Sequence, residues 1–141
     1  MSRVINIETA GKERTLLSRH ILLAIRELGQ SNNDLVKSRD LVAFIIITLS
    51  QIAQTIDGSV AAWEKRGYWV KADRFRIEWG WTQIKSDQLY KDLQNQNWDS
   101  IIQQAILITQ KLSMVKLPAR KSAFEVWRDA YILLMKETQG K

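Results

Sequence analysis

The stretch LVAFIIITL, residues 41–49, is the most apolar part of the chain, and it decides the fold. Polar residues follow it at once, beginning with Ser50 and Gln51, so the run falls short of the roughly 20 apolar residues that a membrane-spanning helix requires. Around it, apolar residues recur with the period of about 3.5 residues that is typical of a helix in a left-handed bundle. They are Leu35, Val42, Ile45, Leu49, Ile52, Ile56 and Trp63. The pattern predicts a long, central second helix that continues through Gly58 and ends at Gly67.

Apolar stripes of helical spacing also lie on both sides of this segment. With six Gly and one Pro, the chain has few of the turns that a sheet protein needs. The stripes predict four further helices, over residues 12–28, 68–95, 98–115 and 118–136. Local residues mark several helix ends: Gly29 follows the first helix, Asn33 or Asp34 precedes the second, and Asn97 precedes the fourth.

These segments predict an all-α protein, a four- to five-helix antiparallel bundle with a long central second helix. At 141 residues the chain suits one domain, and we expect residues 1–141 to form it. Residues 1–10 are expected to be a flexible or docking arm.

Composition excludes many chemistries. The chain has no Cys and one His, which excludes disulfides, thiolate zinc sites and any motif with two histidines. Its glycines are isolated, so no phosphate-binding loop is present. We therefore expect no metal, no cofactor and no enzyme activity. The opening residues lack the apolar run of a secretory signal, and we expect a cytoplasmic protein without membrane contact.

Arg14 and His20 form the one arrangement with a catalytic interpretation. The five residues between them fit the R-x4-6-H signature, and this seven-residue match resembles the helical HEPN ribonucleases. The resemblance implies that His20 is the acid–base group and Arg14 the phosphate binder. The other interpretation is that His20 lies at the edge of the buried stripe and has no chemistry. We predict no catalytic residues and keep the ribonuclease as an alternative function.

Two segments concentrate the positive charge. The chain has 21 Lys and Arg against 15 Asp and Glu, and residues 65–76 (KRGYWVKADRFR) hold five basic residues and one acidic. Residues 100–124 hold four basic residues and no acidic one. Such groups neutralise phosphates, and exposed aromatic rings stack on bases, so we expect contact with RNA or DNA backbone. The candidate residues are Lys65, Arg66, Trp69, Lys71, Arg74, Arg76, Lys111, Lys116, Arg120 and Lys121. The positive charge has two other interpretations: a basic surface that binds nothing, or contact with an acidic protein partner.

The predicted third helix has a second apolar face, made of Val70, Ile77, Trp81 and Ile84. A surface helix needs only one apolar face, so this one is expected to meet a second copy of the chain or another subunit. The alternative is that the fifth helix or the N-terminal arm covers it. Four of the six Trp residues fit core stripes, whereas Trp69 and Trp81 do not.

Together these patterns predict a non-catalytic helical subunit or adaptor with a basic face. We expect it to self-associate or to join a larger assembly. A small-molecule sensor with a pocket between helices is a third possibility, for which the sequence supplies no polar anchor.

Overall fold

The computed structural model describes residues 7–31, 33–117 and 125–139. These residues form helices and turns and contain no strand, which confirms the all-α fold class. The six helices are α1 (Ile7–Gly29), α2 (Leu35–Lys65), α3 (Trp69–Trp79), α4 (Trp81–Gln94), α5 (Trp98–Lys111) and α6 (Ala130–Gln139). Because α1 begins at Ile7, residues 7–10 are helical and are not part of an arm; residues 1–6 of the predicted arm lie outside the described residues.

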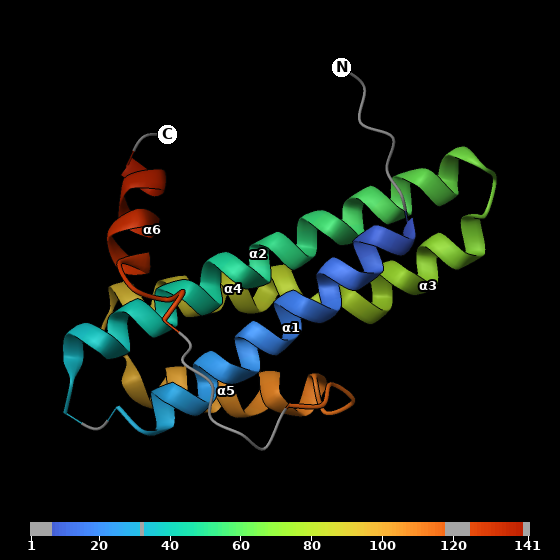
Figure 1. The fold of residues 1–141 in the computed structure, drawn as a ribbon. Coiled ribbons are helices and arrows are strands. Elements are labelled where there is room, and N and C mark those ends of the chain that lie inside the picture. Colours follow the sequence, from blue (N-terminus) through green and yellow to red (C-terminus); the bar gives the residue numbers. More distant parts are fainter. Residues whose placement is uncertain (1–6, 32, 118–124, 140–141) are drawn as a thin grey trace.

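The long helix α2 is the centre of the molecule and packs against α1, α3, α4 and α6 (Figure 1). It runs unbroken through Gly58, as predicted, and is capped by Arg66. Every residue of 41–49 except Ile47 is buried, and Leu41, Val42, Ala43 and Leu49 are fully so. The first residue of the predicted seam, Leu35, is exposed at the end of the helix.

Length and composition alone would also allow α2 to cross a membrane. Its most apolar window of 18 residues has a mean hydropathy of 1.5, and 50% of that window is buried within the fold. Core helices of soluble proteins have the same properties, because a helix that is covered on most sides needs few polar residues. The packing of α1, α3, α4 and α6 around α2 accounts for its apolar surface here.

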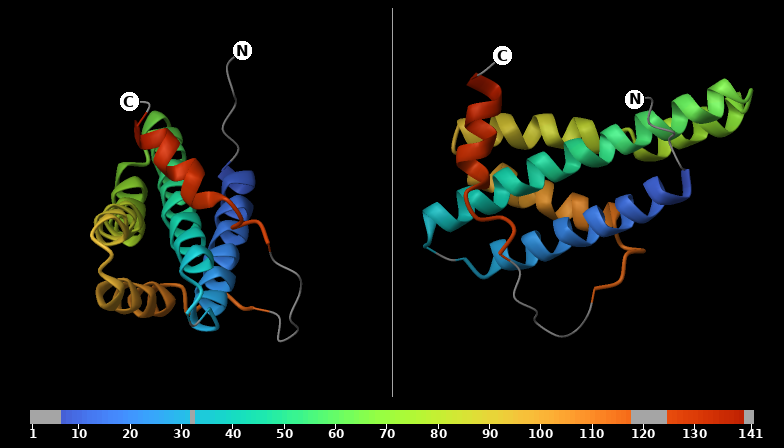
Figure 2. Two further views of the ribbon diagram at one scale, coloured as in Figure 1. Left: turned by 90° about the vertical axis from the view of Figure 1, so that its left-hand side faces the viewer. Right: turned by 45° about the horizontal axis from the view of Figure 1, so that its top comes forward.

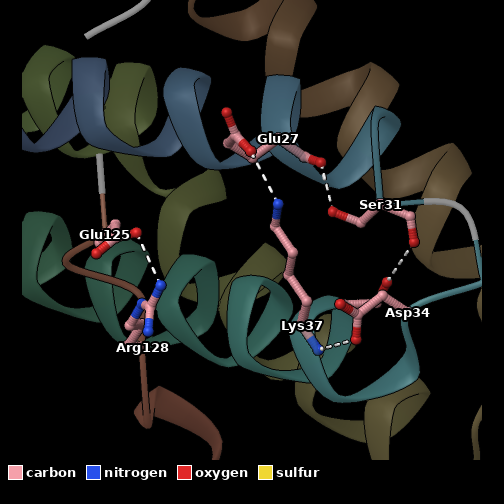
Figure 3. A network of polar contacts seen from close by, with 7 residues as sticks. Glu27, Ser31, Asp34, Lys37, Glu125 and Arg128 are labelled. Carbon is pink, nitrogen blue, oxygen red and sulfur yellow. Dashed lines mark hydrogen bonds and ion pairs between the residues drawn. The ribbon is translucent and has the colours of Figure 1, made fainter. Parts of the chain in front are cut away.

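The turn between α1 and α2 is fixed by local polar contacts (Figure 3). Asn33 takes the left-handed conformation, with φ of 70°, and leaves Asp34 as the N-cap. The Asp34 carboxylate accepts from the backbone N–H of Lys37 at 3.0 Å, which satisfies one of the unpaired donors of the first turn. The Lys37 ammonium pairs with Glu27 of α1 at 3.2 Å. The short turn makes α1 and α2 an antiparallel pair.

The predicted third helix is divided at Gly80 into α3 and α4. A Cβ at this position would lie 2.9 Å from the Arg76 carbonyl oxygen, so only glycine fits the close approach. On the α4 side, the Thr82 hydroxyl donates to the carbonyl of Trp79 at 2.8 Å. Further along, the buried Ser86 hydroxyl donates to the Ile46 carbonyl and holds α4 against α2. Gly80 is therefore both the C-cap of α3 and the N-cap of α4.

The last helix departs furthest from the prediction. Residues 126–129 form a turn, and α6 begins only at Ala130, while Pro118 and residues 119–124 lie outside the described residues. The Asp40 carboxylate of α2 accepts from the backbone N–H groups of Asp129 and Tyr131 at 3.3 and 3.1 Å. This carboxylate fixes the start of α6 from a distance in the sequence. Trp127 is buried beside it, whereas the neighbouring Val126 is 64% exposed.

The molecule has a closed half and an open end (Figure 2). In the closed half α5 packs against α4 and α1, which completes a four-helix arrangement with α2, and α6 crosses over α2. At the other end the hairpin of α2 and α3 extends beyond α4 and α5 (Figure 1). Residues of the first basic segment lie on this hairpin.

Candidate functional site

An open groove of about 980 Å³ lies at the turn between α2 and α3. The turn is tight because Gly67 has φ of +82°, a left-handed conformation that glycine adopts without strain. The backbone N–H of Tyr68 then bonds to the carbonyl of Trp63 at 2.9 Å, and the chain reverses into α3. The groove is lined by Trp63, Gly67, Tyr68, Trp69, Val70, Lys71, Arg74, Phe75 and Glu78.

Aromatic side chains of two kinds line the groove. Trp63 and Phe75 belong to the packing between α2 and α3, with ring centroids 4.8 Å apart in an edge-to-face arrangement. Tyr68 and Trp69 are 54% and 59% exposed. Among the described residues neither of these two rings packs on another ring. Exposed rings of this kind offer a face to a planar ligand.

The five basic side chains of the segment 65–76 differ in whether they form ion pairs. Lys65, Arg66, Lys71 and Arg74 are exposed and form no ion pair within the described part of the chain, and the Lys71 ammonium lies 4.7 Å from the Trp63 ring centroid. Arg76 instead pairs with Glu64 at 2.8 Å and with Asp73 at 2.7 Å. Its hydrogen bond to Glu64 raises the pKa of Arg76.

Acidic neighbours reduce the local charge of this end. Residues 64–78 contain five basic and three acidic residues, because Glu64 and Glu78 flank the basic segment. Arg76 links α3 to α2 and is already balanced, so it has little charge to offer a ligand. The positive charge that remains available belongs to Lys65, Arg66, Lys71 and Arg74.

The second basic segment lies elsewhere. Lys111 ends α5 and Lys116 follows it, and both side chains are exposed. Arg120 and Lys121 lie outside the described residues. Figure 1 shows the end of α5 well apart from the turn between α2 and α3. The two basic segments therefore do not join into one surface.

Three of the four predicted interface residues are exposed. Val70, Ile77 and Ile84 are 68%, 83% and 58% exposed, which is unusual for large aliphatic side chains in a row. Trp81 is partly buried against the core and stacks on Trp79, with centroids 6.3 Å apart and an interplanar angle of 22°. The helix α6, which could have covered this face, packs on α2 instead.

Arg14 and His20 do not meet in one site. The Arg14 guanidinium lies 4.7 Å from the Phe75 ring centroid and donates to the Ser59 hydroxyl at 3.3 Å. The His20 ring lies 6.3 Å from the Phe44 ring. Ser59 and Phe44 are about 22 Å apart along α2, at 1.5 Å per residue, so the two side chains are directed to different places.

The burial of Arg14 is a feature that the sequence did not reveal. Its side chain is 8% exposed, and desolvation lowers its pKa, opposed by the charges of Glu13 and Glu78. Burial also lowers the pKa of His20, which favours its neutral form. A signal was available in retrospect: Arg14 falls on the same helical face as Leu17, Ser18 and Ile21, the face that α1 turns to α2.

The described residues contain no group of three or more His, Asp or Glu side chains placed to hold a metal ion. Comparison with known proteins finds no matching family model, no matching curated protein and no matching solved structure.

Proposed function

We propose that this chain is a non-catalytic helical subunit that binds nucleic-acid backbone at the open end formed by α2 and α3. The observation that carries the proposal is a groove lined by exposed Lys71 and Arg74 and by two exposed aromatic rings, with exposed Lys65 and Arg66 at the end of α2 just before the turn. Unpaired cations neutralise phosphates and release counterions, which favours binding. Arg74 adds a planar fork that meets a phosphate with two hydrogen bonds.

The test is a binding titration with single- and double-stranded DNA and RNA at several salt concentrations. Replacing Lys71 and Arg74 by Ala should weaken binding and reduce the slope of log K against log salt by about 1.5. The control replaces Lys91 and Lys136, which are exposed on α4 and α6, and removes the same charge elsewhere. A third variant, with Lys111 and Lys116 changed to Ala, tests the second basic segment. No binding at low salt, or equal losses in all variants, would refute the proposal.

A second candidate function is association with another copy of this chain, favoured by the row of Val70, Ile77 and Ile84. These residues are seven apart, so an antiparallel pairing centred on Ile77 places Val70 of one copy against Ile84 of the other. The result is a self-complementary face.

Molecular mass in solution tests this association. We expect a dimer that the change Ile77→Asp dissociates without loss of helix content, because a charge in the middle of an apolar contact is left unpaired. Ile132→Asp is the matched control, since Ile132 is 54% exposed on α6. A wild-type chain that stays monomeric at high concentration would exclude a second copy and leave an acidic protein or another subunit as the partner of this face.

A further inference from the structure

We propose that the groove at the turn between α2 and α3 takes an unpaired nucleobase and that Glu78 accepts a hydrogen bond from the amino group of that base. This inference rests on the proposed function, since it names the part of the nucleic acid that the open end recognises. It adds a preference for single strands over duplexes and for amino-bearing bases over uracil.

Of the aromatic rings that line the groove, two have a face open to a ligand. Phe75 has the Arg14 guanidinium over its ring, at 4.7 Å, and the edge-to-face contact with Trp63. The Trp63 ring is in turn covered by the Lys71 ammonium and is only 6% exposed. Tyr68 and Trp69, each more than half exposed, are the rings with faces open to a ligand. Stacking on them requires a base that is not already paired and stacked within a duplex.

The groove also contains one carboxylate, that of Glu78. Glu78 is exposed and lines the groove together with Lys71 and Arg74, which precede it by seven and four residues on one side of α3. Within the described residues it forms no ion pair with either of them. A carboxylate accepts hydrogen bonds and repels phosphate, so in a site for a polyanion it suits a donor group of the ligand.

The amino group of a nucleobase is a suitable donor. Adenine, cytosine and guanine carry amino groups, and carboxylates accept from such groups when they read bases. Uracil has two carbonyl oxygens beside its single N–H, and these oxygens repel a carboxylate. The cations Lys71 and Arg74 lie within a turn or two of Glu78, so the strand's phosphates and the base edge can be met from the same helix face.

The closing experiment compares oligo(dC) with oligo(dU) and with a duplex of equal length. The two bases differ at C4, which carries an amino group in cytosine and a carbonyl oxygen in uracil, and at N3, which carries a hydrogen only in uracil. We expect the wild-type chain to bind oligo(dC) about tenfold more tightly than oligo(dU). Glu78→Gln should bring the two affinities together, chiefly by tightening oligo(dU), because an amide both donates and accepts and no longer repels phosphate. Trp69→Ala should remove the advantage of single strands over the duplex.

The controls separate this inference from the proposed function. Glu78 also lies near the buried Arg14, so the melting temperature of Glu78→Gln is measured beside its binding. A variant that melts earlier but keeps the oligo(dC) preference overturns the role of Glu78. Equal salt-dependent binding of single strands and duplex overturns base insertion and leaves backbone binding standing. Absence of binding to all three probes overturns both.

Discussion

Arg14 shows how much a single residue carries in this fold. It joins three helices, since it belongs to α1, donates to Ser59 and Thr55 of α2 and stacks on Phe75 of α3. A buried guanidinium loses its hydration, and here the hydroxyl groups and the face of an aromatic ring replace part of it. Arg14 therefore helps to hold α3, and with it the open end, against α1 and α2.

Arg14→Ala should lower the free energy of unfolding by about 2 kcal/mol or more, because it removes buried contacts and leaves the Ser59 hydroxyl without its donor. Arg14→Met should cost less, since it keeps the length of the side chain and removes the buried charge. Urea unfolding of the two variants measures the difference. Equal losses would mean that the charge, and not the packing, is what stabilises the contact.

His20 gives the fold a pH dependence of known sign. Burial lowers its pKa below the ordinary value of 6.5, so the folded state binds the proton less readily than the unfolded chain. Stability is therefore full above pH 6.5 and should decline as the pH falls through that value toward the lower folded pKa. Because the chain has one histidine, His20→Gln should flatten the decline in stability below pH 6.5. An unchanged profile in urea unfolding would contradict this.

Among the elements, α6 depends most on a contact distant in sequence. Asp40 of α2 accepts from two backbone N–H groups at its start, and a negative charge there also complements the helix dipole. Asp40→Ala should destabilise the protein by about 1 kcal/mol, the usual effect of losing an N-cap. Thermal unfolding followed by circular dichroism measures the loss.

Asp34→Ala is the matched control, because Asp34 caps α2 through its bond to Lys37. It should cost a similar amount while loosening the first turn of α2 and leaving α6 docked. If Asp40→Ala melts like the wild type, the cap contributes little and burial of Trp127 holds the helix.

The elements that the sequence predicted well are those with local determinants. Asp34 and Asn97 cap their helices through bonds to residues three positions on, as capping residues do. Gly58 and Gly80 look alike in sequence, yet α2 continues through one and the chain breaks at the other, where the Arg76 carbonyl lies close. The start of α6 depends on Asp40, about ninety residues away, and no local pattern encodes it.

For the candidate site, the helical period predicted that Val70, Ile77 and Ile84 lie outside the core, and all three are exposed. It did not predict the position of Trp81, which stacks on Trp79 and packs against the core. The charge count of residues 65–76 could not reveal that Arg76 is balanced by Glu64, because that partner lies across the turn on α2. The burial of Arg14 likewise required the packing of three helices to be known.

At the scale of the whole molecule, the closed half contains most of the hydrophobic core and the open end contains the groove. The closed half holds most of the fully buried side chains, including Leu41, Leu49, Ile101 and Ile108. Burying each such side chain stabilises the fold by about 1.5–3 kcal/mol. At the open end, Ala72 is the one buried residue of α3, so the groove there is formed outside the core.

The way α6 is attached has a consequence for how the molecule opens. This helix has ten residues and packs chiefly on α2, so it should exchange its amide hydrogens through local opening, well before α1, α2 and α4 unfold together. Detachment of α6 would expose Ile46 and Ile47 of α2 and Leu134 of α6 to solvent. The exposed apolar surface would make this intermediate prone to aggregation. Hydrogen exchange should therefore show α6 as the least protected docked helix, and Leu134→Ala should raise both its exchange and the rate of aggregation. Uniform protection across all helices would show that the chain opens as one cooperative unit.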